Sequence, residues 1–544
     1  MKSLQYIFKR KTVLAGVAAA MFATACTKNF EDLNTNPNGI SEEELKQDFM
    51  HIGEPLGQIQ RSIYVYSPSW VVQVQQNLMG DLFSQYTAVP NPFGNLNNNN
   101  NTYNLVDGWN QVLWGCAYGT YAGSPEQSVM PVCRYLEKLT KTDYPQYYAW
   151  MKVLKVFTMH RVADAYGPVI YTKYGVINPD GSVDYDSQKD AYYAFFADLD
   201  ESIKIFSQYV TEGKEITFAG FDLSDYAGSY RLWCKMANTL RLRLALRISK
   251  IDPNKAKAEG ELALKHPLGL LEKAEETFVI NTRPLEHPLL EISSGWGDVR
   301  MSAAMESYLT GLKDPRLNVY FEESKEYPGQ YKGIRQGVEM TTKARYENFS
   351  ALSKLLFSNK KILLMTAAEA WFLKAEAAVE GWQGAGDAKT NYAMGVKTSF
   401  DQHGIATKYD DYIANTTNKP APYVDPKNGA NSIPNGDPLL STITVAWEDG
   451  ATKERKRERI ITQKWIAGFP EGQEAWAEFR RTGYPKLFPV KINNSGGKIP
   501  NGTFIRRVNF VSTEYETNPK GVQKAINLLG GPDNGGTRLW WDKP

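Results

Sequence analysis

The chain has 544 residues, and its 62 Lys and Arg nearly balance its 60 Asp and Glu. This balance argues against a nucleic-acid-binding protein, because phosphate binding needs a basic surface. The length provides ample volume for a hydrophobic core, in several domains or in one large helical domain.

The first 26 residues have the order of an export signal. A basic segment, residues 2–11, precedes the uncharged run 12–25, which ends in small residues before Cys26. The run is shorter than the ~20 residues of a membrane-spanning helix. We therefore predict that residues 1–25 are a signal peptide that is removed from the mature protein.

The position of Cys26 directly after this signal indicates lipidation. A cysteine directly after small residues resembles a bacterial lipobox, although Ala23 stands where a leucine is usual. In a lipobox the thiol receives lipid and becomes the new N-terminus. No later stretch approaches ~18 consecutive apolar residues, so we predict a protein anchored to a membrane through lipid on Cys26. The alternative is an ordinary secreted protein with an unmodified cysteine.

The chain after Cys26 begins with a polar segment and continues with helical patterns. Residues 26–40 are rich in Asn, Pro and Gly, and we expect a flexible tether there. Ser41, followed by three glutamates, predicts a helix start. Apolar residues at three- and four-residue spacing then predict helices over 70–89, 107–140, 144–166, 188–209, 228–250, 253–265, 301–312, 364–381 and 386–403.

Two of these segments, 190–203 and 367–378, alternate small and bulky residues, which lets neighbouring helices pack closely. Such helix pairs resemble tetratricopeptide hairpins, although no clean 34-residue period is visible. We predict a mainly all-α fold, with one domain over residues 41–544 built from tetratricopeptide-like helical hairpins with long irregular loop insertions. Little β structure is expected, with 442–446 and 503–508 as its candidates.

The predicted loop insertions are long. Residues 90–104 contain five consecutive asparagines, and residues 405–460 and 489–540 are rich in Pro, Gly and Asn. The C-terminal third, about residues 405–544, is therefore expected to be loop-rich, and loops of this length are usually functional or face a partner. Within it, the basic run 453–459 is interrupted by two glutamates, which predicts a solvated helix start.

Motifs for catalysis and metal binding are absent from the sequence. The five histidines form no pair at i and i+4, and neither a Gly-x-Ser-x-Gly elbow nor a phosphate-binding loop occurs. Residues 178–186 resemble a calcium loop but lack its final glutamate, which favours caps and turns. We predict no catalytic residue, no metal site and no cofactor. A carboxylate pair that cleaves glycosides stays open, because only spatial separation defines it.

Three cysteines follow Cys26, namely Cys116, Cys133 and Cys234. An odd number of cysteines indicates no disulfide framework, so buried thiols are the favoured interpretation. Pairing of Cys116 with Cys133 stays open, because a sequence does not give the distance between two Cα atoms.

Aromatic residues are the positive signal for a binding site. The chain has 13 Trp, 31 Tyr and 23 Phe. Most should pack between helices, but a ring in an irregular segment can stack on the apolar face of a sugar, with amides bonding its hydroxyls. The two glycines that flank one tryptophan, Trp296, indicate an exposed loop tip. We predict a ligand-binding platform of four rings with two nearby hydrogen-bonding amides: Phe93, Tyr103, Trp109, Trp296, Asn95 and Asn110.

Six separated strings of the sequence, in this order, resemble one family. They are residues 34–41, 161–171, 313–317, 367–377, 463–485 and 537–542. Together they resemble the SusD/RagB family of outer-membrane nutrient-binding lipoproteins, in its SusD-like branch. The matched residues Asp164, Glu369 and Glu376 are interpreted as structural. No ligand-binding motif of this branch is fixed enough to transfer, so the predicted site depends on the aromatic residues alone.

The resemblance implies a tetratricopeptide-like helical domain without catalytic activity. It also implies a lid-like position over a SusC-type TonB-dependent transporter and an outer-membrane location that faces the cell exterior. The cargo would be an oligosaccharide or polysaccharide, or alternatively a peptide. A surface glycoside hydrolase is the less favoured reading.

Overall fold

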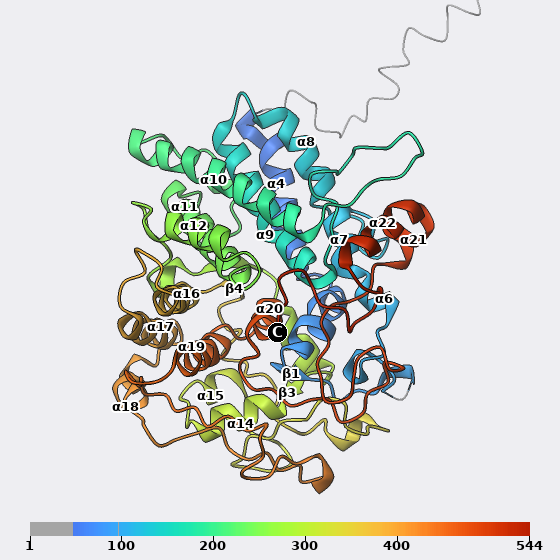
Figure 1. Ribbon diagram of the computed structural model, residues 1–544, viewed down its shortest axis with the longest axis vertical. Helices are drawn as coiled ribbons and strands as arrows, with labels where there is room; N and C mark the ends of the chain where they lie inside the picture. The colour runs from blue at the N-terminus through green and yellow to red at the C-terminus, as the bar shows by residue number, and fades with distance from the viewer. Residues whose placement is uncertain (1–46, 96) are drawn as a thin grey trace, which may run out of the picture. The chain divides into compact units, whose positions relative to one another are not determined.

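The computed structural model describes residues 47–95 and 97–544 (Figure 1). The predicted signal peptide, Cys26, the tether and the helix start at Ser41 lie outside the described residues. Residues 52–544 form one compact unit, which carries the helices that the sequence predicts.

Helices connected by long loops make up most of the first half of residues 52–544. Helix α8 packs on α9, α9 on α10, α10 on α11 and α11 on α12, so successive helices form antiparallel hairpins (Figure 1). The α-helices up to residue 264 are α4 (Met50–Ile63), α5 (Ser69–Val72), α6 (Asp107–Asn110), α7 (Val112–Tyr118), α8 (Met130–Thr140), α9 (Pro145–Tyr166), α10 (Gln188–Glu212), α11 (Tyr230–Arg247) and α12 (Pro253–Leu264).

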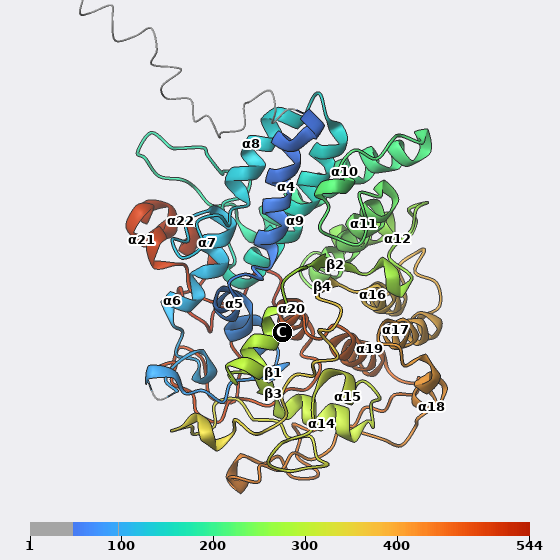
Figure 2. The same ribbon diagram turned by 180° about the vertical axis from the view of Figure 1, so that it is seen from behind.

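The second half adds a second group of helices. Helix α16 packs on α17, α19 and α11, and α10, α11, α12, α16 and α17 follow one another along one side in both views (Figures 1 and 2). The later α-helices are α13 (Pro288–Leu290), α14 (Ala303–Gly311), α15 (Leu317–Tyr320), α16 (Ala367–Val379), α17 (Ala388–Gln402), α18 (Tyr409–Ile413), α19 (Lys453–Ala467), α20 (Gly472–Thr482), α21 (Ser512–Thr517) and α22 (Pro519–Leu529).

Short irregular helices and two small sheets join these groups. The segments η2 (Gln73–Asp81) and η7 (Glu291–Gly295) are π-helices. The 3₁₀ turns are η1 (Gln47–Phe49), η3 (Phe93–Asn95), η4 (Asn100–Thr102), η5 (Ala219–Phe221), η6 (Ala274–Glu276), η8 (Lys343–Arg345), η9 (Ala406–Lys408) and η10 (Gly429–Asn431). Strand β1 (Thr87–Ala88) pairs antiparallel with β3 (Arg300–Met301), and β2 (Phe278–Asn281) with β4 (Lys361–Met365).

Side-chain caps fix where the main helices begin. The Ser187 hydroxyl accepts a hydrogen bond from the Asp190 N–H (3.1 Å) at the start of α10, and Thr366 accepts from the Glu369 N–H (3.0 Å) at the start of α16. Each cap satisfies a backbone donor that the first helical turn leaves free. Helix α10 ends at Gly213, whose φ of 62° favours glycine.

Buried ion pairs tie the central helices together. Arg243 of α11 binds Glu369 of α16 through two hydrogen bonds of 2.8 and 2.6 Å. Glu376 lies two helical turns further along α16 and binds Arg481 of α20 through two hydrogen bonds of 2.8 and 2.7 Å. All four side chains are nearly fully buried. The interpretation of Glu369 and Glu376 as structural residues agrees with these contacts.

The same network perturbs a carboxylate on α20. Burial alone would raise the pKa of Glu474, but Arg247, Arg243 and Lys464 outweigh burial and lower that pKa to about 2. Arg247 approaches Glu474 at 2.6 Å, and the guanidinium is fully buried. Glu474 therefore stays ionised in the interior, because three cations surround it.

The predicted α-helical fold is confirmed, and most predicted helices lie near their expected positions. The predicted helix 107–140 is three helices, because the chain turns at Gly119 (φ 70°) after α7 and resumes helical structure only at α8. The predicted helix 70–89 is a short α-helix that continues as the π-helix η2 and ends before β1. Loop-rich residues 405–460 and 489–540 contain α18, the start of α19, α21 and α22.

The predicted strands 442–446 and 503–508 are wrong. The backbone carbonyls of Thr442 and Thr444 accept hydrogen bonds from Arg455 (2.6 Å) and Arg459 (3.1 Å) of α19, where a strand would need a backbone partner. In the second segment, the Val508 N–H donates to the Ala165 carbonyl at the end of α9 (2.9 Å). Both segments satisfy their backbone groups without a sheet.

Two further expectations concern charged residues and cysteines. The run 453–459 does begin a helix, but Glu458 and Arg459 are buried, so its prediction as solvated is wrong at these residues. Cys116, Cys133 and Cys234 are free and buried, and burial raises the pKa of Cys116 and of Cys133 to about 12. The interpretation as buried thiols is confirmed.

Candidate functional site

The candidate site is centred on the loop that carries Trp296. This loop closes tightly: the Trp296 N–H donates to the Glu291 carbonyl (2.7 Å), and the Asp298 N–H donates to the Ile292 carbonyl (2.9 Å). Gly297 has a φ of 70°, which a residue with a Cβ rarely adopts. The Trp296 side chain is half-buried at the edge of this turn.

Asp298 joins three segments that are distant in the sequence. Its carboxylate accepts hydrogen bonds from Gln73 (3.1 Å), Asn91 (2.9 Å) and Lys343 (2.6 Å). The Lys343 ammonium also donates to the Trp296 carbonyl. Because Asp298 is only 7% exposed, these charge-assisted hydrogen bonds are shielded from water and fix the relative position of the segments.

Phe93 and Trp109 form an aromatic pair on one of these segments. Their ring centroids are 5.0 Å apart in an edge-to-face arrangement, and both rings are half-buried. The Asn91 side-chain oxygen accepts from the Phe93 N–H (2.9 Å), while its amide nitrogen donates to Asp298. Asn91 therefore links the Phe93–Trp109 pair to the Trp296 loop.

The asparagine run 97–101 is buried except for Asn98, which is exposed. Asn100 donates to the Asn110 side chain (2.9 Å) and to the Leu78 carbonyl (2.9 Å), so it satisfies buried polar groups. Tyr103 packs edge-to-face against Phe83 at 6.4 Å. Tyr103 is 6% exposed and Asn110 is 5% exposed, so their predicted place on an exposed surface is wrong. The side chain of Asn95 lies outside the described residues.

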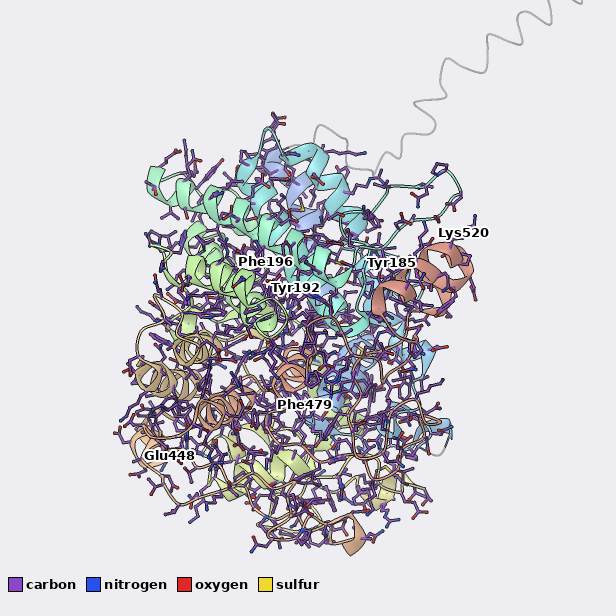
Figure 3. The ribbon with its side chains drawn as sticks, viewed as in Figure 1. Tyr185, Tyr192, Phe196, Glu448, Phe479 and Lys520 are labelled. Atoms are coloured by element: carbon purple, nitrogen blue, oxygen red, sulfur yellow. The ribbon has the colours of Figure 1, made fainter. Side chains whose placement is uncertain are left out.

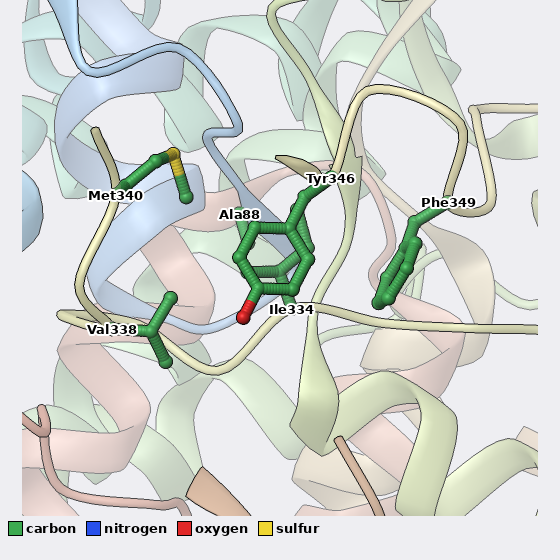
Figure 4. Close-up of a cluster of buried hydrophobic side chains, with 6 residues drawn as sticks. All are labelled: Ala88, Ile334, Val338, Met340, Tyr346 and Phe349. Atoms are coloured by element: carbon green, nitrogen blue, oxygen red, sulfur yellow. The ribbon is translucent and has the colours of Figure 1, made fainter. Parts of the chain in front are cut away.

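A hydrophobic cluster supports the segment that carries Lys343. Figure 4 shows the six buried side chains of this cluster, which brings β1 together with residues 334–349: Ala88, Ile334, Val338, Met340, Tyr346 and Phe349. Such packing holds the backbone on either side of Lys343 in one conformation.

Arg300 binds backbone carbonyls on both sides of the Trp296 loop. Its guanidinium donates to the carbonyls of Ser293 (2.9 Å), Val299 (2.6 Å) and Glu347 (2.6 Å). Burial lowers the pKa of Arg300, although Glu347 and Asp298 act in the opposite direction. The three carbonyl contacts replace water around a buried cation, and they connect the loop to residues 343–347.

In residues 178–186, which resemble a calcium loop, the carboxylates of Asp180 and Asp184 already have protein partners. Asp180 accepts from Ser182 (2.7 Å) and approaches Lys520 of α22 (3.3 Å), which Figure 3 labels. Asp184 pairs with Lys524 (2.6 Å). Caps, turns and ion pairs thus account for these oxygens. Over residues 47–95 and 97–544, no three His, Cys, Asp or Glu side chains are arranged to hold a metal ion.

Comparisons with known proteins identify the family. The family model described as SusD-like, SusD and RagB outer membrane lipoprotein, matches residues 32–542. The chain belongs to the SusD-like family. Family members are nutrient-binding lipoproteins of the outer membrane, so the resemblance of the six sequence strings is confirmed. Among curated proteins there is no match.

Solved SusD homologues share the whole fold. A chitin-binding homologue from Flavobacterium johnsoniae is 44% identical, with a TM-score of 0.86 over 91% of this chain and 99% of its own. A homologue from Bacteroides vulgatus is 35% identical, with a TM-score of 0.83 over 91% and 98%. A homologue from Bacteroides uniformis is 36% identical, with a TM-score of 0.81 over 91% and 99%. In the described part of this SusD-like chain, no helix is long and apolar enough to cross a membrane.

The prediction of Phe93, Trp109 and Trp296 as ligand contacts stays a prediction, and the sequence patterns did not indicate the residues that position these rings. The segments of Phe93 and Trp296 meet at Asp298, and Trp109 packs against Phe93. Asp298 is close to Trp296 in the sequence and could have been noticed as its neighbour. No local signal relates it to Gln73 or to Lys343, because these contacts form only in the folded chain.

Proposed function

We propose that this protein is a surface lipoprotein that captures a neutral glycan and delivers it to a SusC-type transporter. The ligand would bind on the aromatic platform, defined here as Phe93, Trp109 and Trp296. The observation that carries the proposal is that the segments of Phe93 and Trp296 meet at the buried carboxylate of Asp298, while Trp109 packs against Phe93. The chitin-binding relative, 44% identical over its whole length, supports a glycan as the ligand class.

The chemistry of the aromatic platform suits a neutral sugar chain. Each ring offers an apolar face that stacks on a sugar ring, worth on the order of 1 kcal/mol beyond the buried area. The charge of Lys343 is compensated by Asp298 at 2.6 Å, so the cation nearest Trp296 does not attract an anionic ligand strongly. Weak stacking predicts affinities in the ~micromolar to millimolar range, which suit a protein that passes its cargo onward.

Replacing Trp296 with alanine should weaken glycan binding at least about tenfold, which corresponds to ~1.4 kcal/mol. The thermal midpoint should stay nearly unchanged, because the ring is half-buried on a loop that backbone hydrogen bonds hold together. Calorimetric titration with neutral oligosaccharides, including chitin oligomers, measures the affinity of wild type and variant.

Tyr135→Ala is the matched control, because Tyr135 is an aromatic residue on α8 that is 49% exposed. It should leave glycan affinity at the wild-type value. A sharp loss of thermal stability in Trp296→Ala with unchanged affinity would show that Trp296 only packs. Chromatography of the same glycans after incubation separates binding from hydrolysis, since shortened products would indicate an enzyme. If a peptide binds to the protein and none of the glycans does, the result would favour peptide cargo.

The membrane anchor and the partner can be tested in one preparation. We expect protein purified from native outer membranes in mild detergent to carry lipid on Cys26 and to bring a barrel transporter with it. A lid over a transporter needs a contact area above ~1,000 Å², which should survive mild detergent. Mass spectrometry detects both the lipid and the partner. An unmodified Cys26, or consistent recovery of the protein as a lone monomer, would contradict the respective part of the proposal.

A further inference from the structure

We propose that Trp70 and Tyr121 form a second stacking subsite, which takes another ring of the same neutral glycan. In the sequence, Trp70 precedes Phe93 and Tyr121 follows Trp109, and the platform as defined does not include either residue. The inference deepens the proposed function and rests on it, because a second subsite needs a first one.

Trp70 differs from the other tryptophans in its exposure. It is 41% exposed, whereas each of the other twelve is half-buried or buried. Single exposed apolar residues are ordinary on protein surfaces, but Trp70 packs beside a second ring, Tyr121, and a pair of rings offers a sugar more stacking area than one ring does. The exposure of Trp70 thus leaves part of the ring available to a ligand.

Trp70 is held in place and does not project freely. Its ring centroid lies 6.2 Å from that of Tyr121, at an interplanar angle of 58°. Gly123 packs against both rings: a Cβ there would lie 2.9 Å from Trp70 Cη2 and 2.9 Å from Tyr121 Cζ. The Ser124 N–H donates to the Tyr121 carbonyl (3.1 Å), which closes a turn around Gly123. This packing restricts the ring before any ligand binds, so little rotamer entropy is lost on binding.

Hydrogen bonds from the neighbours of Trp70 in the chain join its helix to the loop that carries Trp296. Ser69, the neighbour of Trp70, donates to the Glu291 carboxylate, and Gln73 donates to Asp298 (3.1 Å). Ser69 and Gln73 are four residues apart and therefore lie on one face of the continuous helix formed by α5 and η2. This face packs along residues 291–298. Adding bond lengths from Trp70 through Ser69 and Glu291 to Trp296 places the two Cα atoms within about 20 Å.

The arrangement indicates the class of ligand. Two weak subsites within this distance favour a chain long enough to occupy both, since binding at one raises the effective concentration at the other. Glu291 is exposed between them and would repel an anionic chain. The ligand expected for the combined surface is therefore a neutral oligosaccharide or polysaccharide, bound more tightly as its length increases.

Calorimetry with a short and a long chitin oligomer, the dimer and the hexamer of N-acetylglucosamine, tests the second subsite. Trp70→Ala should leave the affinity for the dimer near the wild-type value and weaken hexamer binding about fivefold or more, the effect of losing one stacked ring. Tyr121→Ala should act in the same direction, and it serves as the second variant should Trp70→Ala fold poorly. Trp70→Phe should restore much of the hexamer affinity, because it keeps an aromatic face.

The outcomes separate this inference from the proposed function. Hexamer affinity at the wild-type value in both Trp70→Ala and Tyr121→Ala would overturn the second subsite, while a loss in Trp296→Ala would leave the first in place. Unchanged affinity in Trp296→Ala as well would overturn the aromatic platform itself. If wild type binds neither these oligomers nor other neutral glycans, the function and the inference both fall. Tyr135→Ala controls for the loss of an exposed ring elsewhere.

Discussion

Replacing Asp314 with alanine should lower the free energy of unfolding by about 3–5 kcal/mol. Asp314 binds Arg316 through two hydrogen bonds of 2.9 and 2.6 Å, and both side chains are fully buried. Without Asp314, the guanidinium would keep only neutral partners, Ser399 (3.1 Å) and Gln463 (2.7 Å) among them. A buried cation that loses its counter-ion is strongly destabilising, because it can neither return to water nor easily lose its proton.

An exposed ion pair provides the control for Asp314→Ala. Asp449 approaches Lys389 at 3.0 Å, but the two side chains are 74% and 56% exposed. Asp449→Ala should therefore change stability by less than ~1 kcal/mol. Denaturant unfolding of both variants, followed by tryptophan fluorescence, compares them with wild type. Equal shifts in the two variants would show that burial of the Asp314–Arg316 pair contributes little.

The helices that the sequence predicts well carry their signals locally. The predicted segment 188–209 corresponds to α10, whose cap Ser187 and terminal Gly213 are both visible in the sequence. Helix α12 likewise begins after the cap Asp252 and agrees closely with the predicted 253–265. Caps, terminal glycines and helical spacing act within a few residues, so they can be recognised without the fold.

The elements that the sequence hides depend on distant partners. Helix α20 buries Glu478 and Arg481, which are polar residues that a local pattern assigns to the surface. Their burial is possible because Arg247 of α11 and Glu376 of α16 lie opposite them. Strands β2 and β4 are short and come together from positions about 80 residues apart, so neither has a local partner that would reveal it.

In the candidate site, too, some residues can be predicted from the local sequence, whereas others depend on distant partners. Loop composition predicts Phe93, Trp109 and Trp296 as ligand contacts, and because the structure leaves these rings half-buried, they stay a prediction. The same reasoning fails for Tyr103 and Asn110, since the asparagine run turns inward and satisfies its own amides there. It also misses Asp298, whose role depends on partners from other parts of the chain.

Trp541→Ala should also lower the free energy of unfolding by about 3–5 kcal/mol, the usual effect of truncating a fully buried tryptophan. Trp541 is fully buried, and its indole N–H donates to the Asp164 carboxylate (2.9 Å). The cations of Arg247 and Arg480 lie 5.4 and 5.1 Å from its ring. In both views the chain end lies beside α20, the helix that carries Arg480 (Figures 1 and 2). The variant would leave a cavity and remove a hydrogen bond from a buried carboxylate, so both effects act in one direction.

The adjacent Trp540 is the matched control, because it has the same side chain in a different environment. It is half-buried, and its ring centroid lies 6.1 Å from that of Tyr192, the α10 residue that Figure 3 labels near Phe196. Trp540→Ala should lower the free energy of unfolding by only about 1–2 kcal/mol, in proportion to the smaller apolar area it buries. Thermal and denaturant unfolding measure both variants, and glycan affinity should be unchanged in either while the protein is folded. If the two variants are equally stable, Trp541 does not hold the central helices together, and the ion pairs around Arg247 would be sufficient for that purpose.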